Sequence, residues 1–256
     1  MENKTSHEQL LLERLNGHPR DERIGFHADK HAYFIDGDPH VISVSQVIAQ
    51  FFPEFDTEFW SKKKAKQRGV PAQQVKEEWA EKGRLAAEKG TYLHEQIEHY
   101  YNGVKHDRSI IEFGYFLKFV AKYPLMEPFR TEWRIFDEQL MLAGTIDMVY
   151  KNPKTGLYFM FDWKRSEKIV DVNGRPILTN YQQGFNGLEH LGDNSFHKYA
   201  LQQNLYKYVL EKNYNIKISS TNLLVLHRNR PHFQIVSVPV MAKEIKVLTE
   251  NFQKLN

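Results

Sequence analysis

The chain has 256 residues, of which 41% are hydrophobic and 13% aromatic, so it can bury a substantial core in one large domain, with or without a helical appendage. Its formal net charge of +3 permits a nucleic-acid partner without requiring one, because the distribution of basic residues matters more than their sum. The absence of cysteine excludes disulfides, iron–sulfur clusters and thiolate zinc sites.

The N-terminus is polar and mixed in charge, unlike a signal or transit peptide. The sequence has no apolar run of about 18 residues, the length that a membrane-spanning helix needs. We therefore expect a soluble, cytoplasmic protein with no membrane partner.

The first part of the chain predicts small elements. Residues 7–16 favour a short amphipathic helix, and residues 30–52 favour a hairpin that turns at residues 36–39. A helix should follow from about Ser45, with Ser43 or Ser45 as its N-cap. We expect residues 1–70 to form a hairpin and helical extension packed on a core made by residues 71–256.

A basic run lies in an aromatic-rich helical segment at residues 51–70. Its members are Lys62, Lys63, Lys64, Lys66 and Arg68. Such a run is most often a solvated helix face. The alternative is that Lys62, Lys63 and Lys64 contact DNA phosphates while the neighbouring aromatic residues stack on single-stranded bases.

Residues 71–101 give the longest helical signal, with apolar residues at three- and four-residue steps and a stop at Asn102. Small residues at Gly83 and Gly90 suggest that another backbone approaches this helix closely. Residues 109–123 predict a second amphipathic helix.

The second half of the chain predicts an α/β fold with a central mixed sheet flanked by helices. Strands are expected at 129–137, 141–150, 157–164, 218–228 and 232–240, and helices at 197–214 and 242–252. The long connection at residues 167–196 has four glycines and little periodicity, which is typical of a functional lid or a disordered segment.

Three charged residues interrupt two apolar strands. Asp162 and Lys164 are two residues apart and point to the same face of their strand, and Asp147 lies on the preceding strand. Unpaired buried charges are costly, so the cluster indicates either mutual ion pairing or a metal site. Two carboxylates suit Mg²⁺ or Mn²⁺, and a lysine can orient or deprotonate an attacking water. This pattern predicts a metal-dependent phosphodiesterase.

The segments GTID, ending at Asp147, and FDWK, ending at Lys164, resemble the core of the PD-(D/E)XK nucleases. Two flanking motifs resemble the RecB-like exonuclease branch of that superfamily. They are Gly90-Thr91-x-x-His94 upstream and Gln202-x-x-x-Tyr206 downstream. All four motifs occur in the order of the family, and the resemblance spans residues 75–240. It implies a restriction-endonuclease-like core.

The resemblance also implies roles for individual residues. The metal ligands would be Asp147, Asp162, His94 and the main-chain carbonyl of Trp163, and Lys164 would be the catalytic lysine. Gln202 and Tyr206 would position the scissile strand or support the site, although a tyrosine at helical spacing is also typical of a core.

Two further acidic residues are candidates for supporting roles. Glu132 matches an acidic position on the preceding strand, but it could equally be a surface charge or a partner of Arg134. Glu98, one turn beyond His94, is a candidate to support the metal ligands.

The implied function is a Mg²⁺-dependent DNA exonuclease, with Mn²⁺ as a substitute, acting on ends or single strands in recombination, repair or replication. Without cysteine, the chain resembles the members of the branch that lack an iron–sulfur cluster. No GxxxxGK[ST] motif occurs, so unwinding would require a separate helicase or recombination protein. Three alternatives stay open: a structure-specific or restriction-like endonuclease on the same core, a catalytically inactive DNA-binding module, and a buried ion network in a protein of other function.

Overall fold

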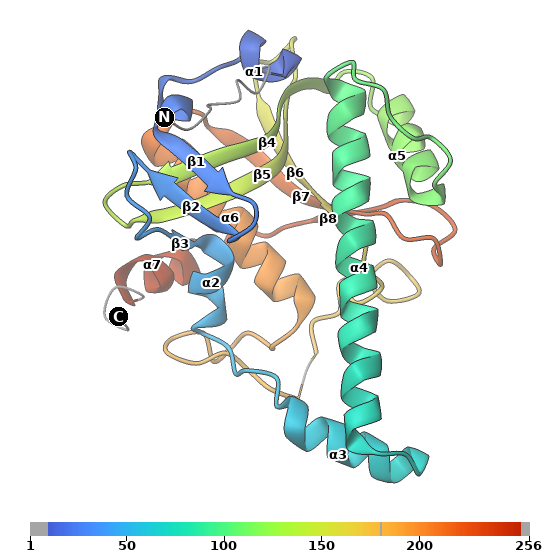
Figure 1. Cartoon of the computed structure of the whole chain (residues 1–256). Helices are drawn as coiled ribbons and strands as arrows, with labels where there is room; N and C mark the ends of the chain where they lie inside the picture. The colour runs from blue at the N-terminus through green and yellow to red at the C-terminus, as the bar shows by residue number, and fades with distance from the viewer. Residues whose placement is uncertain (1–9, 180, 252–256) are drawn as a thin grey trace, which may run out of the picture.

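The computed structural model describes residues 10–179 and 181–251, and its centre is a six-stranded mixed sheet (Figure 1). The strands are β3 (Ile42–Ser43), β4 (Glu127–Asp137), β5 (Leu142–Lys151), β6 (Tyr158–Lys164), β7 (Ile218–Val225) and β8 (Gln234–Ser237). The predicted α/β architecture with a mixed sheet is confirmed.

The strand β5 pairs with one strand along one edge and with two strands along the other. One edge pairs with β4 in antiparallel register from Lys151 back to Leu142. The other edge pairs with β6 at residues 148–151 and with β3 at residues 142–143. Residues 144–147 therefore pair with neither β3 nor β6 on that edge. The sheet continues from β6 to β7 in parallel and from β7 to β8 in antiparallel register.

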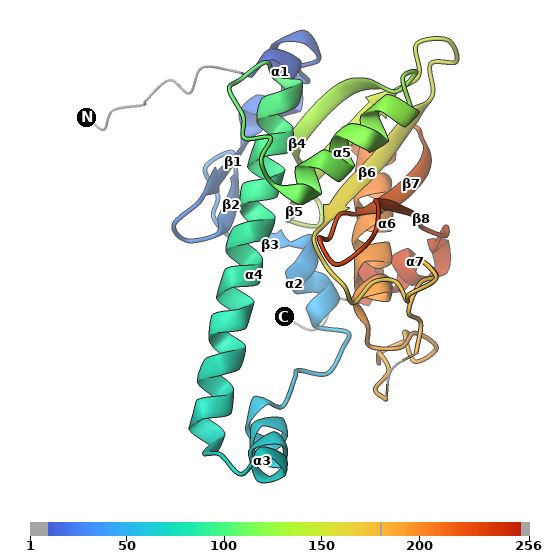
Figure 2. The same cartoon turned by 90° about the vertical axis from the view of Figure 1, so that its right-hand side faces the viewer.

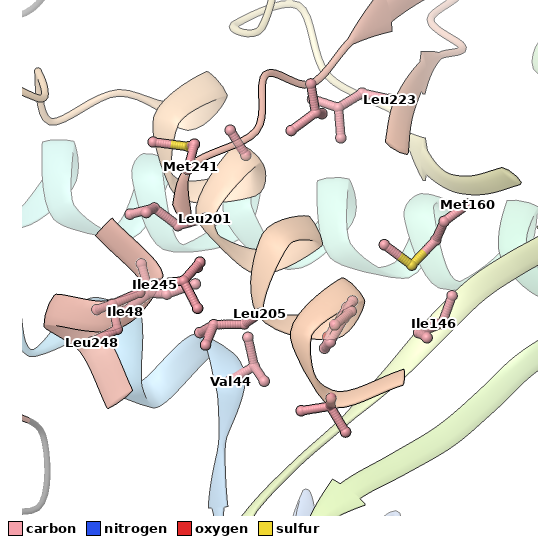
Figure 3. Close-up of a cluster of buried hydrophobic side chains, with 14 of the residues drawn as sticks. Val44, Ile48, Ile146, Met160, Leu201, Leu205, Leu223, Met241, Ile245 and Leu248 are labelled. Carbon is pink, nitrogen blue, oxygen red and sulfur yellow. The ribbon is translucent and has the colours of Figure 1, made fainter. Parts of the chain in front are cut away.

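Helices cover both faces of the sheet. One face packs against α2 (Val44–Ala49), α6 (Ser195–Asn213) and α7 (Ala242–Asn251), and the other packs against the C-terminal part of α4 (Ala72–Tyr101) and against α5 (Ile111–Lys122). Figure 3 shows α6 in the middle of the larger core, where Leu201 and Leu205 meet side chains of α2 and α7. Burying such side chains stabilises the fold by about 1.5–3 kcal/mol each.

The helix α2 starts where one of the two suggested caps lies. Ser43 Oγ accepts a hydrogen bond from the main-chain N–H of Gln46, and the main-chain N–H of Ser43 donates one to Gln46 Oε1. Ser43, rather than Ser45, is therefore the N-cap. Because β3 and α2 join the sheet and its main core, residues 42–52 are part of the core rather than an extension on its surface.

The predicted hairpin is wrong in its pairing. A two-residue turn does form at Asp36 and Gly37, both with positive φ, but only Ile35 and Asp38 pair across it. The real hairpin joins β1 (Ile24–His27) to β2 (Ala32–Ile35), and it packs on the end of β4 through Ile24 and Ile35. The segment 24–27 was missed because it is too short to show a period. Before it come α1 (Leu11–Leu15) and a short 3-10 helix (Pro19–Arg23).

The helix α4 leaves the sheet and runs on to α3 (Thr57–Arg68), as Figure 2 shows. We call α3 with the N-terminal half of α4 the arm. Residues 80–89 of α4 are all exposed, and a Cβ placed on Gly83 or Gly90 would meet no described atom within 4 Å. The expected close approach of another backbone is therefore wrong. These small residues face open space.

The connection between β6 and α6 is anchored in its described residues. Ile169, Val170 and Leu188 are fully buried in the main core. The Arg230 guanidinium donates hydrogen bonds to the carbonyl oxygens of residues 167, 170 and 171. The expectation of a disordered segment is therefore wrong for these anchored residues. Within the described chain, no helix combines the length and apolar character needed to cross a membrane.

Candidate metal centre

The candidate site lies where β5 and β6 separate. The pairing of the two strands ends at Met148 and Phe161. Main-chain N–H groups alternate between the two edges of a strand, so the next one on the β5 side of β6 belongs to Trp163, and it has no main-chain partner on β5. The Oδ2 atom of Asp147 accepts a hydrogen bond from this N–H at 2.7 Å. The side chain of Asp147 thus holds the two strands together at the point where the ladder stops.

The alternation of side chains is broken at this position. Ile146 and Val149 pack into the core on the α6 face, whereas Met148 packs into the core under α4 and α5. On β4, Glu132 faces Asp147, and its φ of 42° is left-handed, which is uncommon for a residue with a side chain. Such strained backbone is typical of functional sites. The irregularity brings both carboxylates toward α4.

The imidazole of His94 on α4 faces these two carboxylates. Its Nε2 donates a hydrogen bond to the carbonyl oxygen of Trp163 at 3.0 Å. Its Nδ1 lies 3.4 Å from Glu132 Oε1 and 3.6 Å from Asp147 Oδ2. One ligand atom from each of the three side chains lies within 4.8 Å of the other two, and we call them the three-ligand cluster. Imidazole nitrogen and carboxylate oxygen are ligands for several divalent cations.

The protonation of His94 shows what this cluster requires. Because Nε2 donates to a carbonyl, a neutral ring would turn the lone pair of Nδ1 toward two carboxylates. Burial opposes the charged ring, but the carboxylates of Asp147 and Glu132 prevail and raise the pKa of His94 to about 9. The cluster thus favours a positive charge at this point, either a proton on Nδ1 or a cation.

Asp162 and Lys164 form an ion pair beside the cluster. Asp162 Oδ2 lies 2.6 Å from Lys164 Nζ, yet this buried oxygen accepts no hydrogen bond of good geometry from the described residues. Burial raises the pKa of Asp162 to about 7 even though Lys164 opposes the shift. Burial lowers the pKa of Lys164, but Asp162 and Asp147 raise it by a larger amount, so the ammonium stays charged. Its Nζ lies over the ring of Tyr199, 4.3 Å from the ring centroid.

The structure assigns two acidic residues differently from the sequence. Glu132, expected as a support, surface charge or partner of Arg134, belongs to the three-ligand cluster, and its ion pair is with His94. Asp162, expected as a ligand, lies outside that cluster and pairs with Lys164. Glu98 is also outside it, and burial together with the charge of Glu132 raises its pKa to about 7.

Gln202 and Tyr206 lie on α6 against β5. Gln202 Nε2 donates to the hydroxyl of Tyr206 at 3.1 Å, and Gln202 Oε1 is buried with no hydrogen-bond partner among the described residues. The Tyr206 ring lies on Gly144, where an added Cβ would come within 2.4 Å of Tyr206 Cε1. The glycine of the GTID segment therefore makes room for this tyrosine, which the sequence alone did not reveal.

Two polar groups near the cluster were not expected there from the sequence: Tyr33 was missed, and Arg134 was considered only as a partner of Glu132. The hydroxyl of Tyr33 on β2 shares a hydrogen bond of 2.9 Å with Thr145, two residues before Asp147. Arg134 on β4 pairs in register with Thr145; it is exposed and forms no ion pair with any described residue. The spacing of β1 and β2 in sequence gives no sign that this hairpin packs beside the site.

The basic run lies at the far end of α4 from His94. Lys62 pairs with Glu58 at 3.1 Å, and the ammonium of Lys63 lies 4.8 Å from the centre of the Trp60 ring. Lys64 is exposed. The structure does not bring these lysines to the three-ligand cluster.

Comparisons with known proteins identified no relative of this chain. A scan against models of protein families found no match, and a search of curated proteins found none either. The assignment of a function therefore rests on the site itself.

Proposed function

We propose that the protein is a metal-dependent nuclease of the PD-(D/E)XK type that hydrolyses phosphodiester bonds of DNA. The observation that carries this proposal is the three-ligand cluster of His94, Glu132 and Asp147 beside the ion pair of Asp162 and Lys164. Acidic ligands can hold a metal ion that activates water, and a fixed ammonium can balance the negative charge that develops during phosphodiester hydrolysis.

The residues fit a divalent cation such as Mg²⁺ or Mn²⁺. His94, Glu132 and Asp147 would hold it, close to the carbonyl of Trp163. Asp162 Oδ2, buried and without a hydrogen bond from the described residues, is a further acceptor beside them. A cation bound there would neutralise phosphate charge and lower the pKa of a water molecule.

Residues around the cluster would orient water, balance charge and contact the substrate. Burial lowers the pKa of Lys164, but Asp162 and Asp147 raise it by more, so its ammonium would orient water and balance the charge of the transition state. Asp162 and the Tyr199 ring fix its position. Tyr206 fills the space above Gly144 and supports β5 next to Asp147. The exposed guanidinium of Arg134 is available for a substrate phosphate.

The preference for an exonuclease rests on the resemblance of the His94 and Gln202–Tyr206 motifs to the RecB-like branch. In that role the enzyme acts on DNA ends or single strands during recombination, repair or replication. A separate helicase or recombination protein would supply any unwinding.

The test is a nuclease assay on end-labelled single- and double-stranded DNA with Mg²⁺, with Mn²⁺ and with EDTA. We expect cleavage that EDTA abolishes and that Asp147→Asn and Lys164→Met each reduce by about a hundredfold or more. Lys105→Met, which removes an exposed lysine beyond the end of α4, is the matched control and should leave the rate unchanged.

Cleavage by Lys164→Met at the rate of the unaltered protein would overturn the proposal. A covalently closed circular substrate decides between the two nuclease types, since an exonuclease leaves it intact. Binding of DNA without cleavage under every metal condition would instead identify an inactive DNA-binding module.

A further inference from the structure

A group of aromatic side chains stands exposed on the arm. Phe55, Phe59 and Trp60 keep 61%, 54% and 38% of their surface exposed. The ammonium of Lys63 lies 4.8 Å from the Trp60 ring centre and 6.0 Å from that of Phe59. We call these four residues the arm patch. Large apolar side chains that cluster on a surface usually mark an interaction site.

Apart from Phe55, whose ring contacts Trp79 of α4, the packing of the arm does not use this patch. The helix α3 buries Ser61 and Ala65 in its contact with α4. Phe59 and Lys63, one turn apart, fall on the opposite side of α3, since each residue turns the helix by about 100°. The patch therefore remains available to a ligand after the arm has folded.

Its contact with aromatic rings distinguishes Lys63 from the other basic residues of α3. Lys62 and Lys76 both pair with Glu58, and Arg68 pairs with Glu78. Lys63 forms no ion pair with any described carboxylate and lies against aromatic rings instead. A cation beside exposed aromatic faces suits a ligand with phosphates and flat bases better than a purely apolar partner.

We propose that the arm patch is a second binding site for single-stranded DNA, in which bases stack on Phe59 and Trp60 while Lys63 contacts a phosphate. This inference rests on the proposed function, because it assumes a DNA substrate. It adds a contact that lies outside the three-ligand cluster and takes no part in the chemistry.

The distance between the two sites predicts a dependence on substrate length. The Phe55 ring contacts Trp79 edge-on, with centroids 5.8 Å apart, and Trp79 and His94 lie on the same continuous helix. At 1.5 Å per residue, the intervening stretch of α4 is about 22 Å long. A strand with stacked bases covers that distance in about seven nucleotides. Residues 80–89 between them are exposed, so α4 leaves a solvent-facing path along its side.

The first experiment measures DNA binding in EDTA by fluorescence anisotropy, with single-stranded oligonucleotides of about 5 and about 20 nucleotides. For the double variant Phe59→Ala and Trp60→Ala, we expect the affinity for the longer strand to fall about tenfold or more. Affinity for the shorter strand should fall much less, because that strand cannot reach both sites and gains nothing from joining them. The control, Leu15→Ala with Leu125→Ala, removes two exposed leucines elsewhere and should bind both strands normally.

The second experiment tests the role of Lys63 through salt. Lys63→Ala should reduce the slope of log affinity against log salt for the longer strand by about 0.7, while Lys105→Ala should leave the slope unchanged. Normal binding of the longer strand by the double variant would overturn the inference, as would an equal loss for both lengths.

The two proposals fail in different ways. If the protein binds the longer strand through the arm patch but cuts no DNA, the nuclease assignment fails and the arm patch stands. If it cuts DNA and the double variant binds the longer strand normally, the arm patch fails and the nuclease assignment stands.

Discussion

The candidate metal centre and the arm use charge in opposite ways. In the centre, Asp147 and Asp162 are 7% and 2% exposed, and each needs a specific partner to remain charged. On the arm, Arg84 pairs with Glu81 and Glu88 in full contact with solvent. Buried charges are costly without partners, whereas surface pairs contribute little. The buried cluster is therefore the stronger candidate for a functional site, and the charge of the arm alone does not make one.

The glycines of the two regions differ in the same way. Gly144 in the centre is needed because the Tyr206 ring occupies the space of a side chain. Gly83 on the arm has no described neighbour within 4 Å of a Cβ position, and nothing in the packing requires it. A small residue therefore has a structural reason in the centre and none that is visible on the arm.

Removing the lysine of the centre should have the largest effect. Lys164→Met leaves the buried Asp162 without its partner, so we expect a loss of about 3–5 kcal/mol in the free energy of unfolding at neutral pH. The loss should grow as the pH rises above about 7, because Asp162 ionises there only when Lys164 is beside it. Urea unfolding at several pH values measures it.

The double variant Lys164→Met with Asp162→Asn is the control for that prediction. It removes both charges, so it should recover most of the stability while remaining inactive. A double variant as unstable as Lys164→Met would show that the ion pair is not the cause.

Cation binding should stabilise the centre most at alkaline pH. The pKa of His94 is raised from 6.5 to about 9, so its protonated ring contributes stability that is complete below pH 6.5 and is lost as the pH rises through about 9. The pKa of Asp162 is also raised, so its protonated form contributes stability that is complete below pH 3.8 and is lost as the pH rises to about 7. A divalent cation replaces the missing positive charge.

We therefore expect Mn²⁺ at a hundredfold excess over its dissociation constant to stabilise the protein by about 2.7 kcal/mol. The same total concentration should stabilise it less at pH about 6 than at pH about 8, because protons then compete for His94. Thermal unfolding with and without Mn²⁺ measures both. An equal shift at the two pH values would show that the cation binds elsewhere.

The two glycines give a matched pair of substitutions. Gly144→Ala forces Tyr206 away from β5 and should destabilise the protein by about 1–3 kcal/mol and reduce activity. Gly83→Ala should stabilise it by about 0.5–1 kcal/mol, because alanine is the better helix former and meets nothing. Chemical unfolding of both variants checks the signs, and the same sign for both would contradict the account.

The smallest effect is expected on the arm. Arg84→Ala removes two exposed ion pairs, and the free energy of unfolding should change by less than about 0.5 kcal/mol. A loss above about 1 kcal/mol would show that the arm depends on these pairs more than exposed charges allow.

Much of the fold follows from local pattern. The cap of α2, narrowed to Ser43 or Ser45, the apolar face of α5 and the charged residues of β6 depend on neighbours in sequence, so periodicity and capping rules indicate them. The positions of β4 to β8 also follow in outline, since turn residues bound most of these strands. The hairpin β1–β2 escapes these rules because its strands are short and find their position on β4 only in the folded chain.

The ligand set could be predicted only in part. His94 and Asp147 were expected as ligands, and the structure brings them together. The place of Glu132 depends on a left-handed residue inside a strand, and no rule of alternation produces that conformation. Likewise, the spacing of the motif does not determine where β5 and β6 separate, and this position decides which groups Asp162 can contact. In the structure Asp162 pairs with Lys164 and lies outside the three-ligand cluster.

The central claim is that the three-ligand cluster binds a divalent cation, and calorimetric titration with Mn²⁺ tests it most directly. Glu132→Gln should weaken binding about tenfold or more. The control Glu98→Gln alters a neighbouring carboxylate outside the cluster and should bind as the unaltered protein does. No Mn²⁺ binding by the unaltered protein, or equal losses in the two variants, would contradict the claim.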